Sequence, residues 1–156
     1  TLVLAHSAAV DPRRLADILI RSLGLMHPAV VSEDEIGAAL ESGRDVILVG
    51  LPRDPARLPA LPTGVALGVE RFAVNRETFE RSDETFFGVF RHPQTAARVL
   101  AVLLPLGPLG AESAAGKITH YGRYGFLAFR DGENRTKGSW PPDPSPVAYQ
   151  WTSTGN

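Results

Sequence analysis

The chain has no cysteine, and this absence limits its chemistry at once. Disulfide bonds, thiolate metal ligands and a cysteine nucleophile are excluded, while the redox compartment stays open. An excess of either charge is also missing, because the formal net charge of the 156 residues is -1. A nearly neutral chain has no global field that draws it to nucleic acid or to an acidic membrane. We therefore expect no nucleic-acid partner.

Long apolar runs and the common cofactor and metal motifs are absent as well. No run approaches the roughly 18 residues of a membrane span. No G-x-G-x-x-G follows the first predicted strand, where residues 8–10 read Ala-Ala-Val. The histidines show no spacing typical of metal ligands: they are His6, His27, His92 and His120. We expect no membrane span in this segment, no cofactor and no metal site.

The length suits one domain, since a chain of about 150 residues buries roughly 70% of its unfolded surface. We expect this domain over residues 1–140. Four prolines after Trp140 predict an extended tail over residues 141–156. The chain opens at Thr1 directly on a strand-like run and has no signal peptide. We interpret it as a domain cut from a longer protein.

Three short apolar runs predict strands in the first third of the chain, at residues 2–5, 29–31 and 45–50. The third run has no polar alternation, which is typical of a strand covered on both faces in a parallel sheet. Sequences with helical spacing separate the three runs. The first third therefore predicts a β-α-β-α-β arrangement.

Capping residues mark where the two intervening helices begin. Asp11 and Pro12 provide an N-cap and a proline at the first helical position, and Gly24 ends that helix. Ser32 and Glu35 have the spacing of a capping box, in which each side chain bonds to the backbone amide of the other residue. The second helix therefore begins directly after the second strand.

The middle of the chain changes character. Four prolines between residues 51 and 64 predict a loop with at most one helical turn. Apolar and polar residues then alternate over residues 71–81, which predicts a β-hairpin that turns near Asn75. The hairpin has no counterpart in a simple parallel arrangement, so we expect an insertion here.

Residues 85–91 predict a further strand, and residues 99–104 fit an antiparallel partner for it. The alternative for the second segment is a helix over residues 93–104, which its short length and the proline that follows disfavour. Phe86 and Phe87 point to opposite faces of the first strand, so at least one ring must be covered. A helix of this domain, a neighbouring domain or a second subunit would supply the cover.

The last part predicts a helix over residues 108–120, a strand over 124–130, a tight turn and a return strand over 136–140. Gly122 stands where a helix C-cap glycine is preferred. Together these elements predict a three-layer α/β domain with a mixed, mostly parallel sheet. The arrangement resembles a flavodoxin-like topology with an antiparallel hairpin insertion.

Several polar residues follow the predicted strands and should meet at the carboxyl ends of the sheet, where open α/β sheets bind ligands. The residues expected at this edge are His6, Ser7, Arg53, Asp54 and His92. A hydrolytic interpretation makes Ser7 the nucleophile and His92 the base, oriented by Asp11 or Asp54. Ser7 lacks the G-x-S-x-G turn of such nucleophiles, and its hydroxyl is equally suited to bonding the loop backbone.

The most distinctive stretch runs from Lys117 to Trp140. It begins at a predicted helix C-terminus and leads into the next strand, which places it at the edge opposite to the usual ligand site. We expect its rings to cover the sheet edge, and Lys117 and Arg123 to bond carbonyls or nearby acids. The candidate structural residues of this motif are Lys117, His120, Tyr121, Gly122, Tyr124 and Trp140.

This stretch reads KITHYGRYGFLAF at residues 117–129, followed by GEN and KGSW. It resembles the segment beyond the catalytic part of bacterial zinc aminopeptidase-like proteins, which has the form K-I/L/V-P-H-Y-G-K-Y-S-Y-L-x-F, G-x-N and K-G-x-W. The departures are Thr119 for proline, Arg123 for lysine and Gly125 for serine, and they leave the ring and glycine skeleton intact.

The resemblance implies a non-catalytic accessory or interaction domain of a larger bacterial peptidase-like protein. The zinc signature H-E-x-x-H is absent, so no catalytic residue is carried over. Other domains of the same polypeptide or a second subunit would be the partners, and the location would be periplasmic or secreted. The alternative is a small-molecule-binding or hydrolytic domain that uses the edge around His6, Ser7 and Arg53.

Overall fold

The computed structural model describes residues 1–5, 10–58 and 60–140, which form an α/β fold with a mixed sheet. His6, Ser7 and the expected tail over residues 141–156 lie outside the described residues. The strands are β1 (Leu2–Leu4), β2 (Val30–Ser32), β3 (Val46–Val49), β4 (Val65–Leu67), β5 (Phe72–Val74), β6 (Glu77–Phe79), β7 (Glu84–Arg91), β8 (Val99–Pro105), β9 (Phe126–Arg130) and β10 (Glu133–Gly138). The α-helices are α1 (Pro12–Ser22), α2 (Ile36–Glu41) and α3 (Ala111–Lys117), and the 3-10 helices are η1 (Glu33–Glu35), η2 (Pro55–Arg57) and η3 (Ile118–Tyr121).

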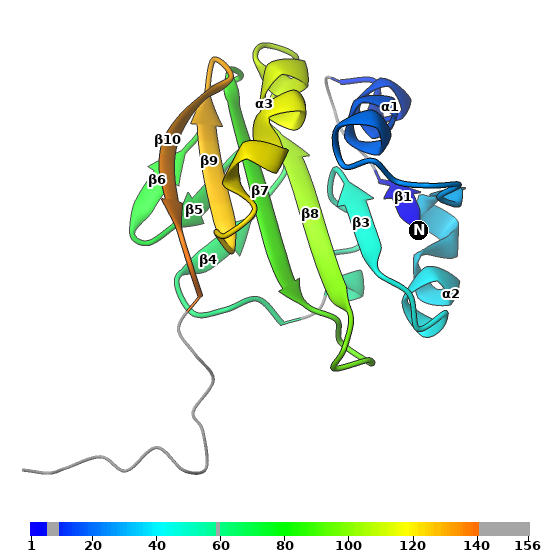
Figure 1. The fold of residues 1–156 in the computed structure, drawn as a ribbon. Helices are drawn as coiled ribbons and strands as arrows, with labels where there is room; N and C mark the ends of the chain where they lie inside the picture. The colour runs from blue at the N-terminus through cyan, green and yellow to red at the C-terminus, as the bar shows by residue number, and fades with distance from the viewer. Residues whose placement is uncertain (6–9, 59, 141–156) are drawn as a thin grey trace, which may run out of the picture.

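Within the described residues, seven strands form the main sheet in the order β10-β9-β7-β8-β3-β1-β2 (Figure 1). Strands β2, β1, β3 and β8 run parallel, and Leu2 of β1 lies between Val30 and Ile47. Strands β7, β9 and β10 complete the sheet in antiparallel pairs. The order β2-β1-β3 confirms the predicted β-α-β-α-β start. The pairing of β7 with β8 excludes a helix over residues 93–104.

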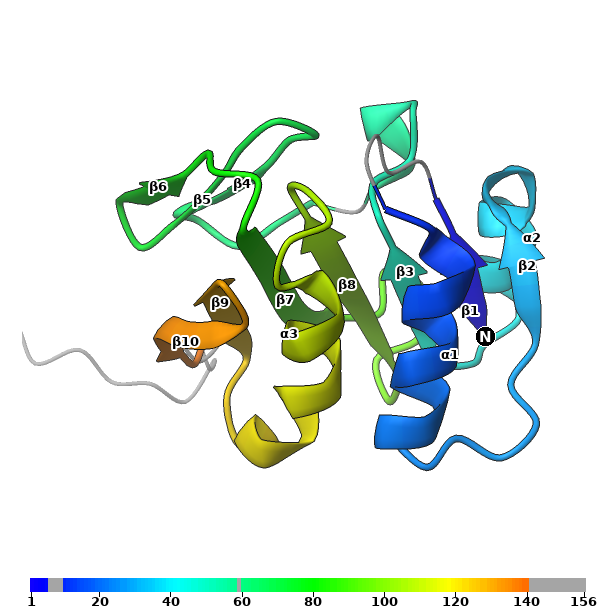
Figure 2. The same ribbon diagram turned by 90° about the horizontal axis from the view of Figure 1, so that it is seen from above.

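Three layers enclose two apolar cores (Figure 2). Helices α1 and α3 cover one face of the main sheet, where Leu15 and Leu19 pack in the same core as Ala114 and Ala115. Helix α2 and the small sheet β4-β5-β6 cover the other face. Arg14 and Glu112 join the two helices of the first face through an exposed ion pair of 2.6 Å. The sheet is therefore covered on both sides, as the unbroken apolar run of β3 predicts.

The small sheet is more than the predicted hairpin. Strands β5 and β6 form that hairpin, and its turn residues Asn75 and Arg76 both have positive φ angles, of 52° and 69°. The sequence did not predict β4, which pairs antiparallel with β5. Only three residues long and preceded by prolines, β4 is too short to show a period-2 pattern. Phe72 and Phe79 turn their rings towards the main sheet.

Local capping follows the sequence prediction at the two first helices. The Asp11 carboxylate accepts a hydrogen bond of 2.9 Å from the Arg13 amide at the start of α1. Ser32 and Glu35 form the expected capping box, in which the Ser32 amide donates to the Glu35 carboxylate at 3.1 Å. Among the described residues, no helix is long and apolar enough to cross a lipid bilayer.

The last helix is shorter than predicted, and its glycine cap is at the other end. Helix α3 continues only as the 3-10 turn η3, and Gly122 has an ordinary φ of -56°. Gly110, which precedes α3, has φ = +73° and lies against the β9–β10 turn, where an added Cβ would stand 2.6 Å from the Gly132 amide nitrogen. Only glycine readily adopts this positive φ and also leaves room for the Gly132 backbone. Strand β10 begins at Glu133, three residues earlier than predicted, and contains a bulge.

Candidate functional site

The carboxyl ends of β1, β2 and β3 meet at one edge of the main sheet, as predicted for the ligand edge. An open recess of about 430 Å³ lies there. The described residues that line it are Leu4, Ala5, Pro12, Ser32, Glu33, Asp34 and Arg53. Of the described residues of the predicted ligand edge, Arg53 is the one that lines this recess. His6 and Ser7 would follow β1 but lie outside the described residues.

Hydrogen bonds at this edge hold the loops in place. The Arg53 amide donates to the Glu33 carboxylate at 2.6 Å, and the Arg57 guanidinium donates to the Glu33 carbonyl at 3.2 Å. The Asp54 carboxylate accepts from the Ala56 amide at 3.0 Å and so caps η2. Asp54 therefore serves the local turn, while the exposed guanidinium of Arg53 pairs with no carboxylate of the described residues.

His92 lies at the opposite edge of the sheet. It follows β7, which runs antiparallel to β8, and so stands near the amino ends of the parallel strands. Its ring is buried, and Nδ1 accepts hydrogen bonds from the amides of Gln94 (3.3 Å) and Thr95 (3.2 Å). Nε2 is buried and has no hydrogen-bond partner within the described part of the chain. The structure therefore does not bring His92 to Arg53 and Asp54, and His92 cannot be the base of a hydrolase at that edge.

Metal binding finds no support in the described residues either. Across residues 1–5, 10–58 and 60–140, no three His, Cys, Asp or Glu side chains are grouped so as to hold a metal ion. His120 is exposed on η3, and His92 is buried with its Nδ1 bonded to the turn.

Several side chains of the Lys117–Trp140 motif bond to other parts of the same domain. Lys117 Nζ donates to the Gly132 carbonyl at 2.9 Å and to the Glu133 carboxylate at 2.5 Å, as the predicted bonding to carbonyls and acids requires. The Trp140 indole N–H donates to the Val89 carbonyl at 2.6 Å and ties the end of β10 to β7. These contacts lie within the domain, so they are structural.

Ring–glycine contacts explain the spacing of the motif. The Trp140 ring covers Gly125, where an added Cβ would stand 2.9 Å from ring atom Cδ1. The Phe126 ring covers Gly138, its cross-strand partner, where an added Cβ would stand 2.6 Å from ring atom Cζ. Trp140 also packs against Phe126 in a tilted arrangement, with ring centroids 4.9 Å apart. The glycines are needed because aromatic rings occupy the space of their missing side chains.

The motif also leaves a group of side chains at the protein surface, which we name the basic aromatic surface. Its members are His120, Tyr121, Arg123, Tyr124 and Lys137. Lys137 Nζ stands 5.2 Å from the ring centroids of both Tyr121 and Tyr124. The Arg123 guanidinium carbon lies 5.1 Å from the Tyr124 centroid, and Nη2 donates to the Tyr124 hydroxyl at 3.0 Å. Arg123 therefore contacts a tyrosine, where the sequence predicted a carbonyl or an acid.

The sequence did not single out Lys137 as part of a site. A weak signal was present, because Lys137 is one of two lysines in the chain. Its register opposite Leu127 turns it to the helix-covered face, towards Tyr121 and Tyr124. That register depends on the bulge between Asn134 and Thr136, which no periodicity in the sequence reveals.

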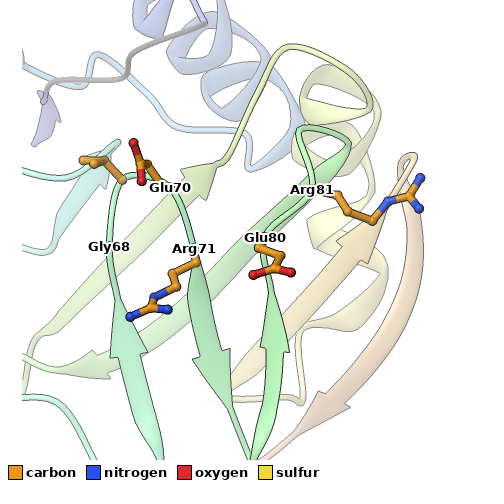
Figure 3. A pocket seen from close by; sticks show the side chains of 6 residues that line it. Gly68, Glu70, Arg71, Glu80 and Arg81 are labelled. Carbon is orange, nitrogen blue, oxygen red and sulfur yellow. The ribbon is translucent and has the colours of Figure 1, made fainter.

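A second recess, of about 860 Å³, lies between the β4–β5 turn and the segment after β6 (Figure 3). Its charged residues are Glu70, Arg71, Glu80 and Arg81. Arg81 turns away from the recess and bonds the Asp83 carboxylate through Nε and Nη2, both at 2.9 Å. This pair holds the pKa of Asp83 below its ordinary value. Because both signs of charge are present, the recess has no evident preference for an anion or a cation.

Three surfaces thus stand out on the described residues: the recess at Arg53, the mixed-charge recess of Figure 3 and the basic aromatic surface. The basic aromatic surface alone combines rings with charges of one sign, which suits contact with a macromolecule better than chemistry. No protein-family model matches the sequence, and no curated protein is similar enough to it to count as a relative.

Proposed function

We propose that this domain is a non-catalytic accessory or interaction domain of a larger bacterial peptidase-like protein. The observation that carries the proposal is the basic aromatic surface, in which Tyr121, Tyr124 and Arg123 lie at the surface on a firmly held base. Tyrosine and arginine are enriched in protein–protein interfaces and among the residues that dominate their binding energy. The surface belongs to the same stretch that resembles the zinc aminopeptidase-like proteins.

The use of the polar side chains elsewhere supports an architectural role for the domain. His92 caps a turn, Lys117 bonds the β9–β10 turn, and Glu84 is buried in an ion pair with Arg130. Groups suited to acid–base chemistry are thus bonded inside the fold. A scaffold of this kind presents a surface without supplying a reaction.

The test uses the full reading frame that contains this segment. Turnover of a chromogenic amino-acid anilide is measured for the whole protein, for a deletion of residues 1–156, and for chain 1–156 alone. We expect the deletion to keep its turnover number and chain 1–156 to show none. We also expect chain 1–156 to bind the deleted remainder when the two are mixed, measured by isothermal titration calorimetry.

Two results would contradict the proposal. One is turnover by chain 1–156 alone. The other is loss of turnover in the whole protein on a Ser7→Ala or His6→Ala change, with the fold intact by circular dichroism. Arg13→Ala, on the exposed first turn of α1, is the matched control, because Arg13 makes no described side-chain contact at the sheet edge.

The alternative function is binding or hydrolysis of a small molecule at the recess beside Arg53. The observation that favours it is the place of the recess, at the carboxyl ends of parallel strands with a guanidinium at its rim. An anionic metabolite that binds there would be released by Arg53→Ala and retained by Arg57→Ala, because Arg57 is not among the described residues that line the recess. Equal affinity in the two variants would exclude this site.

A further inference from the structure

We infer that the basic aromatic surface docks an acidic protein segment, rich in Asp and Glu, that belongs to another domain. The inference rests on the proposed function and names the chemistry of its partner. Two cations contact one ring: Arg123 lies 5.1 Å and Lys137 Nζ 5.2 Å from the Tyr124 centroid. Like charges held on the same ring repel each other, and a bound carboxylate relieves that repulsion.

The cations of this surface have no acidic partner within the described part of the chain. Within the described residues, Arg123 contacts Tyr124, and Lys137 contacts Tyr121 and Tyr124. Glu133 is the acid nearest in sequence to Lys137, but it forms an ion pair with Lys117, with 2.5 Å between Nζ and Oε1. His120 is exposed on η3, next to Tyr121 in the chain. The surface therefore offers donors that a carboxylate can satisfy.

The rings are held still, which lowers the entropic cost of docking. Tyr121 packs edge-on against buried Phe129, with centroids 6.0 Å apart, and stands 6.5 Å from Tyr124. Phe129 lies in the core beneath α3. The side chains of Arg123 and Lys137 rest on these rings and are positioned before a partner arrives. A pre-positioned surface retains more of its interaction energy as affinity.

The contacts favour a protein partner over a nucleic acid or a membrane. Nucleic-acid binding by tyrosines relies on open ring faces on which bases stack, whereas here the cations lie over the rings. Recognition of an anionic membrane typically requires about four to eight clustered basic residues. The surface has two permanent cations and one histidine, a number that suits a short acidic segment.

The probe is octaglutamate, titrated into isotopically labelled chain 1–156 at low and high salt. We expect saturable shifts in the NMR signals of Tyr121, Arg123, Tyr124 and Lys137, weakened by salt. Arg123→Glu and Lys137→Glu should each weaken binding roughly tenfold, as expected when an attractive charge contact becomes repulsive. Arg13→Glu makes the same change of charge at the far end of the helical layer and should leave affinity unchanged. Arg123→Gln and Lys137→Gln are the second variants in case a glutamate variant fails to fold, because each removes the charge without reversing it.

Several results would overturn the inference. One is octaglutamate binding that Arg123→Glu and Arg13→Glu weaken equally, since that would show a general charge effect. Tighter binding of octathymidylate, or self-association of chain 1–156 that Lys137→Glu abolishes, would assign the surface to a nucleic acid or to a second copy. If chain 1–156 binds the remainder of its reading frame and Arg123→Glu leaves that affinity unchanged, the inference fails while the proposed function stands.

Discussion

Glu84 and Arg130 form an ion pair that joins the ends of β7 and β9. Glu84 Oε1 accepts hydrogen bonds from Arg130 Nε at 2.8 Å and from Nη2 at 2.6 Å. The other Glu84 oxygen accepts from the Arg81 amide at 2.9 Å. The Glu84 side chain is 1% exposed and that of Arg130 is 35% exposed. The pair therefore places a buried carboxylate where β7 begins and satisfies it from two sides.

Removal of either side of this pair should be costly for stability. We expect Glu84→Ala to lower the free energy of unfolding by about 3–5 kcal/mol, because a buried charge-pair partner and three hydrogen bonds are lost together. Glu84→Gln keeps the shape and should lose about 1.5–3 kcal/mol. Urea denaturation measures both variants. A loss below that of the exposed pair variant Glu112→Ala would contradict the structural role of Glu84.

Two glycine-to-alanine changes should have effects of opposite sign. At Gly88, in β7, an added Cβ would stand 2.6 Å from Phe86 Cζ and 2.8 Å from Phe90 Cζ. Both rings are buried, so Gly88→Ala should destabilise the fold by about 1–3 kcal/mol. At Gly116, in α3, no atom lies within 4 Å of the added Cβ. Gly116→Ala should stabilise it by about 0.5–1 kcal/mol. Denaturant midpoints measure both variants, and the same sign at both positions would refute the ring packing described around Gly88.

The parts of the fold that the sequence predicted are those with strong local signals. Some elements are specified by a few adjacent residues. These are the helix caps at Asp11, Ser32 and Glu35 and the strand β3 with its unbroken apolar run. The pairing of β7 with β8 followed from length and a bounding proline. What could not be predicted depends on distant partners. Position 110, for example, requires glycine because the backbone of Gly132, distant in the sequence, lies against it.

The candidate sites show the same limit. Arg53 was expected at the carboxyl edge because a strand places it there, and it lines the recess. His92 was expected there too, but the direction of β7, set by its pairing with β8, carries it to the other edge. The position of Lys137 over Tyr121 depends on a bulge in β10. Strand direction and bulges arise from tertiary pairing, so local pattern reasoning does not reach them.

A single change in the β5–β6 turn should stabilise the protein. Asn75 and Arg76 form the two-residue loop between paired Val74 and Glu77, and both have positive φ. Asparagine tolerates this conformation, whereas arginine is strained in it. We expect Arg76→Gly to raise the free energy of unfolding by about 0.5–1 kcal/mol, net of the entropy that glycine adds to the unfolded chain. Asn75→Ala is the control and should lose about 1 kcal/mol. A neutral or unfavourable Arg76→Gly, measured by thermal denaturation, would argue against this turn type.

The Arg81–Asp83 pair should leave a mark on the pH dependence of stability. Hydrogen bonds from the Arg81 guanidinium to the Asp83 carboxylate hold the pKa of Asp83 below its ordinary value. The pKa of Asp83 is lower in the folded protein than in the unfolded chain. The ion pair therefore stabilises the fold fully above the pKa of an unfolded aspartate, and this stabilisation is lost as the pH falls through the folded pKa. Stability of the wild-type protein should therefore fall more steeply in acid than that of Asp83→Asn. An NMR titration of the Asp83 carboxyl should show its pKa rise in Arg81→Gln. An unchanged pKa in that variant would mean that the hydrogen bond from the Asp83 backbone amide and the charge of Arg130, and not the Arg81 guanidinium, lower the pKa of Asp83.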